Sequence, residues 1–382
     1  MKTVNGIYTS AQIFTETIED YALAQIRMLC DHPASAGSRI CIMPDVHPGT
    51  PGPVGLTQTI RDCVLPAMVG SDIGCGISLI KIKQKKLEFQ QLDTLIREHI
   101  PVGPAIRRKA HPLSGEFDCT RLYCHRHINS EKARLSLGGG NHFIEADRDE
   151  EGNLYLVVHS GSRHLGKEVT DHYMRAGSLR LKETHPDTPY LLTWLTGELM
   201  EQYLHDMSLI TEFAALNREI ILAELTKRMK LKVTGRISCI HNYIGLLPSD
   251  PESDPEQPGK APVPVIRKGA ISAKAGEPLI IPVNMRDGVI LATGKGNPDW
   301  NYSAPHGSGR IMARNEVKNH YSVSRFKAEM ARIHCSCIGA DTLDESPFAY
   351  RADDEIIRAI EPTATVTNLI KPVYNYKAGS RK

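Results

Sequence analysis

Apolar residues in this chain occur in short runs separated by stretches rich in glycine and proline. The runs Ile40–Met43, Ile77–Ile82 and Leu154–Val158 predict buried strands. Two shorter strands are expected at Ile280–Ile281 and Val289–Ala292. The glycines and prolines between these runs favour structured loops. The pattern therefore predicts strands that are joined by long loops.

Helical spacing is clearest in residues 188–231, where Leu191, Leu195 and Leu199 recur at four-residue steps. Pro189 is the only proline of this stretch and lies at its start, where a helix tolerates it. We therefore expect two successive helices there. Shorter helical regions are expected at Thr15–Leu29, Phe89–His99, Val323–Ile333 and Asp353–Ala359.

Length and composition are typical of a soluble globular protein. The chain has 382 residues, of which 41% are hydrophobic and 24% charged. It contains no run approaching the ~18 apolar residues of a membrane span and no leader-like start, so we expect a cytoplasmic protein without membrane contacts. Strands and helices together predict an α+β fold in one catalytic domain over residues 1–382, with residues 248–264 as a proline-rich loop insertion.

Charge and cysteine content narrow the classes of function. The 46 basic and 44 acidic residues give a net charge of +2, which argues against coating nucleic acid by bulk charge but permits a local basic groove. The nine cysteines show no disulfide-framework spacing and are expected to be reduced thiols. With 16 histidines, such a chain can supply metal ligands.

Several glycine-flanked motifs carry metal-ligand residue types. The segment Gly70–Gly76 contains Asp72 and Cys75, a hard and a soft ligand that together suit a borderline transition metal. His142 follows three glycines, and His159 and His241 follow apolar runs. Each motif alone also fits a capped turn or a buried histidine, but their number favours a metal and phosphate site.

Other motifs carry residues for phosphate chemistry. Asp45 lies on the loop MPDVHPG, Arg163 follows the strand that ends near His159, and Lys268 lies in VIRKGA. His306 lies between proline and glycine in APHGSGR. A rigid histidine beside anion-binding groups can act as a nucleophile, because an imidazole nitrogen can form a covalent intermediate.

These motifs together resemble one known family. MPDVHPG, VGSDIGCG, GGGNHFIE, HSGSRHLG, HNY, RKGA and HGSGR occur in the order found in the RtcB-type RNA-splicing ligases, and the similarity extends from Met43 to Lys377. The resemblance implies an enzyme that joins RNA 3′-phosphate or 2′,3′-cyclic phosphate ends to 5′-hydroxyl ends, with GTP and manganese as cofactors. The helical segment from Tyr203 to Arg218 also resembles this family.

The resemblance also implies roles for individual residues. One Mn²⁺ would be bound by Asp72, Cys75 and His142, and a second by Cys75, His159 and His241. Residue types alone would suggest zinc as readily. His306 would be the guanylated nucleophile, with Asp45, Arg163 and Lys268 as catalytic residues, the latter two on RNA phosphates. The guanine nucleotide would contact Asn141, Phe143, Glu145, Gly307, Ser308, Gly309, Tyr350 and Lys377.

The chain departs from the family's sequence at Ile281–Gly288, where many members carry a P-G-S-M-G loop. This difference keeps a second hypothesis open, a dimetal phosphodiesterase or cyclic-phosphate hydrolase that does not seal RNA. A third is a non-catalytic protein that binds RNA ends, which the intact His306 and ligand set disfavour. The particular RNA, the need for an activating protein partner and the oligomeric state stay open.

Overall fold

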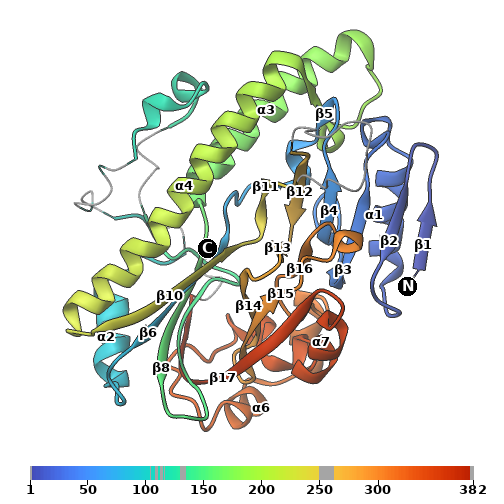
Figure 1. Ribbon diagram of the computed structural model, residues 1–382. Coiled ribbons are helices and arrows are strands. Elements are labelled where there is room, and N and C mark those ends of the chain that lie inside the picture. Colours follow the sequence, from blue (N-terminus) through green and yellow to red (C-terminus); the bar gives the residue numbers. More distant parts are fainter. Residues whose placement is uncertain are drawn as a thin grey trace.

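The computed structural model of the protein describes residues 2–103, 105–107, 111, 115, 117–129, 135–248 and 262–378 (Figure 1). Helices and mixed β-sheets are combined in it, which confirms the predicted α+β class. Most of the proline-rich segment 248–264 lies outside the described residues. None of the described helices is both long and apolar enough to cross a bilayer.

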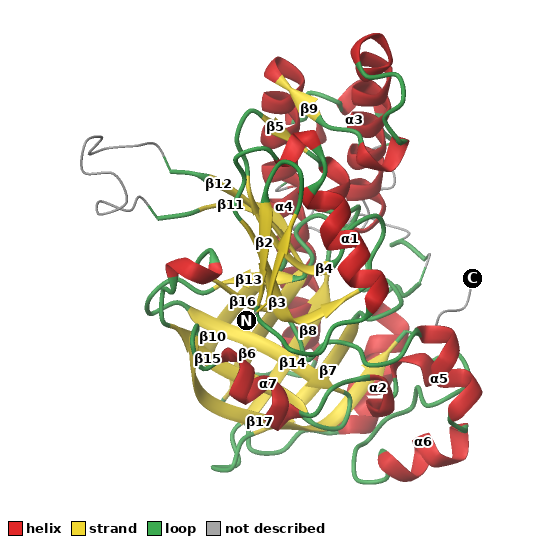
Figure 2. Ribbon diagram, turned by 90° about the vertical axis from the view of Figure 1, so that its right-hand side faces the viewer, coloured by secondary structure: helices red, strands yellow, loops and turns green. Residues whose placement is uncertain are grey.

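A seven-stranded antiparallel sheet forms the lower part of the molecule and is strongly curved (Figure 2). Leucine, isoleucine and valine side chains from its central strands are buried against the helices α2 (Phe89–His99) and α4 (Gly197–Arg228). In spatial order its strands are β10 (Val233–Ile240), β6 (Gly76–Ile82), β8 (Leu154–Ser160), β7 (Phe143–Arg148), β17 (Ala364–Lys377), β15 (Gly288–Gly294) and β14 (Pro278–Asn284).

A second, six-stranded sheet contains the N-terminal strands and is mixed, because β2 and β3 run parallel while the other neighbours are antiparallel. In order it consists of β1 (Lys2–Asn5), β2 (Ser10–Ile13), β3 (Ile40–His47), β4 (Val54–Thr59), β12 (Pro264–Lys268) and β11 (Asn242–Leu246). Two small sheets pair β13 (Ala270–Ser272) with β16 (Ser303–Pro305) and β5 (Cys63–Val64) with β9 (Leu195–Thr196).

The longest helices, α3 and α4, lie side by side above the larger sheet (Figure 1). The α-helices are α1 (Asp20–Cys30), α2 (Phe89–His99), α3 (Arg163–Thr184), α4 (Gly197–Arg228), α5 (Arg314–His320), α6 (Val323–Glu329) and α7 (Asp353–Ile360). Short 3₁₀ helices are η1 (Pro33–Ser35), η2 (Pro66–Met68), η4 (Cys119–Arg121), η5 (His125–His127), η7 (Tyr190–Leu192), η8 (Pro298–Trp300), η9 (Leu343–Glu345) and η10 (Pro347–Ala349).

The prediction of two successive helices in 188–231 was wrong. The stretch contains the single long helix α4, preceded by a 3₁₀ turn at Tyr190–Leu192 and the short strand β9. Leu195 is buried because it pairs with Val64 in that strand, so its helical spacing from Leu191 was a coincidence. Pro189 precedes the 3₁₀ turn instead of starting an α-helix.

The 22-residue helix α3 was not predicted from the sequence. Its two glycines lower its helix propensity. Both are required by packing, since a Cβ at Gly166 would lie 2.8 Å from the Ser71 carbonyl oxygen and one at Gly177 would lie 2.4 Å from Leu195. Tertiary contacts thus stabilise a helix that local pattern disfavours.

Other predicted elements are confirmed. The helix expected at Phe89–His99 has those bounds, and the strands expected at Ile77–Ile82 and Leu154–Val158 lie within β6 and β8. The strands expected at Ile40–Met43, Ile280–Ile281 and Val289–Ala292 lie within β3, β14 and β15.

Candidate functional site

Five neighbouring strands of the larger sheet bring predicted site residues together at one end of the strands. Because β10, β6, β8, β7 and β17 are antiparallel in that order, the beginning of each strand lies beside the end of its neighbour. His241 follows β10, Cys75 precedes β6, and His159 lies near the end of β8. His142 precedes β7, and Lys377 ends β17 opposite Phe143. These residues therefore share one end of the sheet although up to 302 positions separate them.

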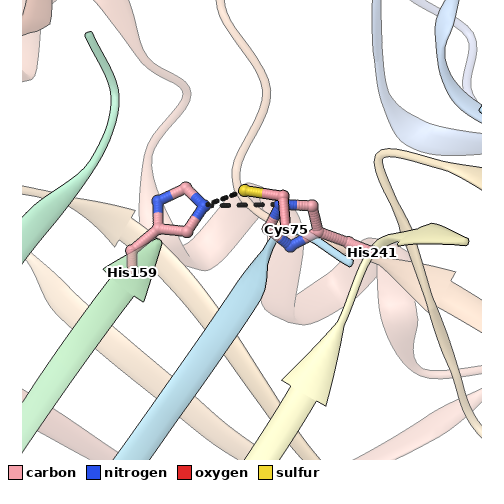
Figure 3. A group of neighbouring side chains, drawn as sticks. All are labelled: Cys75, His159 and His241. Carbon is pink, nitrogen blue, oxygen red and sulfur yellow. Dashed lines mark hydrogen bonds between the residues drawn. The ribbon is translucent and has the colours of Figure 1, made fainter. Parts of the chain in front are cut away.

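Cys75, His159 and His241 point toward one another at this end of the strands (Figure 3). The Cys75 Sγ lies 3.3 Å from His159 Nε2, and the two histidine Nε2 atoms are also 3.3 Å apart. All three side chains are buried. This arrangement directs one sulfur and two nitrogen atoms to a common point.

A second group shares the same thiol. The Cys75 Sγ lies 3.3 Å from His142 Nε2, which in turn lies 3.0 Å from Asp72 Oδ2. Within each group the candidate ligand atoms lie within 4.8 Å of one another. One oxygen, one sulfur and three imidazoles are ligand types that could hold a transition metal, and Cys75 belongs to both groups. The structure thus brings together all five predicted metal ligands.

Main-chain carbonyl groups orient two of the imidazoles. His142 Nδ1 lies 2.8 Å from the carbonyl oxygen of Leu137, and His159 Nδ1 lies 3.1 Å from that of Asn141. A proton on Nδ1 that is donated to a carbonyl leaves Nε2 free for a metal. Burial lowers the pKa of His159 well below its ordinary value and does the same for His241, so both rings are neutral at pH 7.

The thiol and the carboxylate of the group respond differently to burial. Burial raises the pKa of Cys75, and the negative charge of Asp72 raises it further. Burial also opposes ionisation of Asp72, but a hydrogen bond with His142 and the charge of Arg163 hold its pKa below the ordinary value. A buried thiol beside a carboxylate becomes a thiolate when a cation supplies positive charge, which is what a metal site requires.

Arg218 of α4 stabilises the loop that carries Cys75. Its guanidinium is fully buried and donates hydrogen bonds to the carbonyl oxygens of Gly74 at 2.8 Å and Ser160 at 3.0 Å. A third bond, of 3.1 Å, reaches Ser78 Oγ. The sequence resemblance included this residue but gave it no role. Its contacts with Gly74 and Ser160, each next to a candidate ligand in the sequence, could be found only from the fold.

His306 lies beside this cluster and is held by Asp45. Its Nδ1 lies 2.7 Å from Asp45 Oδ2, and the same oxygen accepts the backbone N–H groups of His306 and Gly307 at 3.1 and 3.3 Å. The His306 and His241 ring centroids are 4.8 Å apart. Because Asp45 binds Nδ1, the Nε2 atom of His306 is the one available for chemistry.

Gly309 permits the close approach of these two segments. It has a φ of +77°, and a Cβ there would lie 2.8 Å from the Asp45 carbonyl oxygen. Any other residue would therefore displace the strand that carries Asp45. The HGSGR motif holds its histidine by backbone packing as well as by the carboxylate.

A single cavity joins His306 and two of the candidate metal-ligand histidines to the predicted nucleotide contacts. All eight predicted contacts line it, together with residues of the β14–β15 turn. The cavity is lined by His159, His241, His306, Gly307, Ser308 and Gly309, by Asn141, Phe143, Glu145, Tyr350 and Lys377, and by Asn284, Met285, Gly288, Arg310, Arg314 and Asn375, among others.

Glu345 is a functional candidate that the sequence did not reveal. Its Oε2 accepts hydrogen bonds from Lys377 Nζ at 2.7 Å and from the Tyr350 hydroxyl at 2.6 Å. Arg310 and Arg314 form ion pairs with its Oε1. Burial opposes its ionisation, but the charge of Lys377 and the two arginines hold its pKa well below the ordinary value. It ends the short 3₁₀ helix η9, in a sequence without a recognisable motif, so only the fold reveals it.

Two buried carboxyl groups lie on the same face of β7. Asn375 donates a hydrogen bond to Glu145, and the buried carboxyl group of Asp147 lies beside Glu145, two residues further along the strand. Burial raises the pKa of Glu145 to about 7, and burial together with the charge of Glu145 raises that of Asp147 well above its ordinary value. The pair therefore binds a proton near neutral pH.

Arg163 and Lys268 differ in their positions. Arg163 has a φ of +57°, donates its backbone N–H to Asp72 at 3.2 Å, and its guanidinium lies 3.2 Å from His142 Nδ1. Lys268 is buried, and its ammonium group donates to the carbonyl oxygens of Thr50 and Ala67. Burial lowers the pKa of Lys268 to about 8. Arg163 is thus beside the metal ligands, whereas Lys268 binds main-chain oxygens.

The segment that departs from the family's sequence forms the turn between β14 and β15. The Asn284 side chain accepts the backbone N–H groups of Arg286 and Asp287 at 2.9 and 3.0 Å and donates to Asp287 Oδ2 at 2.8 Å. Arg286 also pairs with Glu329. A polar network thus fixes the turn at the rim of the cavity.

Comparisons with known proteins identify relatives over most of the chain. The chain is 28% identical over 376 aligned residues to the RNA-splicing ligase RtcB of Escherichia coli K12, with 88% of each chain covered. It is 26% identical to the tRNA-splicing ligase RtcB of Nanoarchaeum equitans, with 92% of this chain and 90% of the relative covered. A profile of the tRNA-splicing ligase RtcB family matches residues 25–123 and 120–378, and the chain belongs to this family.

Proposed function

We propose that this chain is an RNA ligase that joins a 3′-phosphate or 2′,3′-cyclic phosphate end to a 5′-hydroxyl end, with GTP and Mn²⁺. The observation that carries the proposal is His306, bonded to Asp45, in the cavity that also contains metal-ligand histidines. Since residues from Asp45 to Lys377 surround this site, we propose that residues 1–382 act as one catalytic domain.

The first step of the proposed reaction is the guanylation of His306. Its Nε2 attacks the α-phosphate of GTP, so a P–N bond forms and pyrophosphate leaves. Asp45 keeps the proton on Nδ1 and stabilises the positive charge that develops on the ring. The guanylyl group then passes to the RNA 3′-phosphate, the 5′-hydroxyl attacks that phosphate, and GMP leaves.

Two Mn²⁺ ions are proposed at the two ligand groups, the first with Asp72, Cys75 and His142 and the second with Cys75, His159 and His241. When bound, they would supply positive charge that stabilises the transferring phosphoryl group. The ligand types suit zinc as well. Restoring activity to metal-free protein with Mn²⁺ and, separately, with Zn²⁺ distinguishes the two ions.

The far end of the cavity is proposed to bind guanine. Phe143 and Tyr350 would stack on the base, and the Glu145 carboxylate would accept its N–H groups. Lys377 would contact the base from the end of β17. Asn141 and the Gly307–Gly309 backbone would lie along the rest of the nucleotide.

RNA is the proposed second substrate, with Arg163 and Lys268 as phosphate contacts. Arg163 is the better supported of the two, because it lies beside the metal ligands. The cytoplasmic location expected from the sequence stays a prediction, as does any activating protein partner.

The proposal is tested by incubating the purified protein with α-labelled GTP and Mn²⁺. We expect an acid-labile protein–GMP adduct that is absent in His306→Ala and present in His185→Ala, whose histidine is exposed on the C-terminal side of α3. A wild-type protein that binds GTP but forms no adduct would contradict the ligase mechanism.

The alternative function is a dimetal hydrolase that opens cyclic phosphates without sealing. It is favoured by the turn at Asn284–Gly288, which lines the cavity and departs from the family's sequence. Incubating the protein with an RNA that ends in a 2′,3′-cyclic phosphate and a second RNA that begins with a 5′-hydroxyl distinguishes the two functions. A joined product supports the ligase, and a 3′-phosphate that accumulates without joining supports the hydrolase.

A further inference from the structure

Two cysteines outside the metal cluster lie close enough to form a disulfide bond. Cys335 and Cys337 lie between α6 and η9, and their Sγ atoms are 3.2 Å apart. Both are free thiols and only partly buried, and Ser336 between them is exposed. A disulfide requires an S–S distance of about 2.05 Å, so the two atoms need to approach by about 1 Å.

Helix α2 holds the backbone between the two thiols. Ser336 Oγ hydrogen-bonds to Asp93, and Arg97 donates to the Ser336 hydroxyl at 2.8 Å and to its carbonyl oxygen at 3.3 Å. The Tyr374 hydroxyl also donates to Asp93, at 3.0 Å. These contacts link the segment to both α2 and β17, which keeps the two thiols together.

The surroundings of the two cysteines give their thiols different pKa values. A hydrogen bond from Cys335 lowers the pKa of Cys337, and the backbone N–H of Lys377, 3.1 Å away, lowers it further. The same hydrogen bond to Cys337 raises the pKa of Cys335. Cys337 is therefore the better nucleophile, and Cys335 is the adjacent thiol that can resolve an oxidised intermediate.

The pair is bonded directly to a wall of the cavity. Besides the Lys377 N–H, the neighbouring His334 donates its N–H to Val373 O at 3.1 Å and accepts from Asn375 N at 3.0 Å. Lys377 and Asn375 both line the cavity. A change at Cys337 Sγ therefore acts on the strand end that carries two cavity residues.

We propose that Cys335 and Cys337 form a redox-sensitive modification site whose disulfide alters the nucleotide end of the cavity. With hydrogen peroxide as oxidant, the Cys337 thiolate attacks one peroxide oxygen and the O–O bond breaks. Hydroxide is the leaving group, and Cys337 becomes a sulfenic acid. The Cys335 thiol then attacks that sulfur, the S–S bond forms, and water leaves. Overall, two thiols and one peroxide give one disulfide and two waters.

Disulfide formation weakens the contact between Cys337 and the Lys377 N–H, because closing the S–S bond moves the Cys337 Sγ toward Cys335 and away from that N–H. Loss of one hydrogen bond corresponds to a change of up to about tenfold in an equilibrium constant. We therefore expect GTP affinity to fall by up to about tenfold on oxidation, a consequence that rests on the proposed function. The disulfide itself does not depend on that function.

The test treats the full-length, metal-loaded protein with hydrogen peroxide, alkylates the remaining thiols, and analyses tryptic peptides by mass spectrometry. We expect the peptide from Ile333 to Arg351 to lose two hydrogens and to escape alkylation. Hydrogen exchange of residues 372–378 should rise, and dithiothreitol should reverse both changes. GTP affinity is measured on the same samples.

Cys335→Ser should prevent these changes, whereas the control Cys63→Ser, which removes a partly buried thiol on β5, should leave them intact. An alkylated Cys335–Cys337 peptide under conditions that oxidise other thiols would overturn the proposal. A disulfide that leaves the exchange of residues 372–378 unchanged would overturn the link to the cavity. If exchange rises while the protein never binds GTP, the proposed function fails and the redox site stands.

Discussion

The proposed metal end of the site (Asp72, Cys75, His142, His159 and His241) is oriented in part by main-chain carbonyl groups, whereas Lys377 and Tyr350 of its proposed guanine end (Phe143, Glu145, Tyr350 and Lys377) are held by an ionised side chain, that of Glu345. His142 and His159 are oriented by carbonyl groups of neighbouring loops. At the guanine end, Glu345 binds Lys377, Tyr350 and two arginines.

This difference predicts different sensitivities at the two ends. Main-chain contacts do not titrate, so the orientation of the ligands at the metal end should depend on the fold, and metal binding on the identity of the ligands. Ion pairs depend on the presence of every member, because a lost member leaves a buried charge unpaired. Substitutions should therefore separate the two ends.

Cys75→Ser should have the largest effect. Both candidate metal groups contain this thiol, so the change removes a ligand from each at once. Substitution of a residue that only supports a ligand typically costs roughly 10–100-fold in metal affinity or activity, and a shared ligand should cost more. Bound manganese measured by plasma mass spectrometry should fall with ligation. Cys63→Ser is the control, and full metal occupancy in Cys75→Ser would refute the bridging role.

Asp45→Asn should come next. The amide keeps the shape of the carboxylate but can donate a hydrogen to His306 Nδ1, which favours the wrong tautomer. An equivalent change in a Ser-His-Asp triad lowers kcat by about 10⁴, and we expect a loss on the order of 10³ in the rate of adduct formation. Metal content should stay normal. Equal rates in variant and wild type would show that Asp45 does not orient the nucleophile.

The residues of the metal end could be named from the sequence, whereas Glu345, which supports the guanine end, could not, and the difference has a physical reason. Each candidate metal ligand lies within a short motif that resembles one of the family, so the resemblance could name all five, and the structure brings them together. Glu345 has no such motif. The role of Glu345 depends on its ion pairs with Lys377 and Arg310, both of which are distant from it in the sequence. Only folding brings their nitrogen atoms within 3.4 Å of its carboxylate oxygens.

The same reasoning applies to the fold. Strands such as Leu154–Val158 were predicted because a fully buried strand is a continuous apolar run. Helix α3 was missed because Gly166 and Gly177 disfavour a helix locally and are explained by close tertiary packing. Long-range packing is what a local pattern cannot report.

Glu345→Gln should weaken the guanine end without removing metal. The amide leaves the Lys377 ammonium buried without its carboxylate partner, and breaking such a pair typically costs about 3–5 kcal/mol of stability. We expect a lower melting temperature and a GTP KM raised on the order of tenfold. Glu355→Gln breaks a half-exposed pair with Arg351 and serves as the control. Loss of metal in Glu345→Gln would contradict the separation of the two ends.

The smallest expected effect is a pH dependence at Glu145. Burial raises its pKa to about 7 from an ordinary value of 4.5, so the folded protein holds an extra proton between these values and loses stability as pH rises through them. Guanine needs the carboxylate as acceptor, so affinity should increase several-fold from about pH 6 to about pH 8. Glu145→Gln should flatten this dependence in direct binding measurements with a fluorescent guanine nucleotide. A hydrogen bond from the neighbouring Asp147 lowers the pKa of Glu145, so Asp147→Ala, which removes that bond, should shift the midpoint upward. An affinity that falls between about pH 6 and about pH 8 in the wild type alone would show that the protonated carboxyl group binds the base.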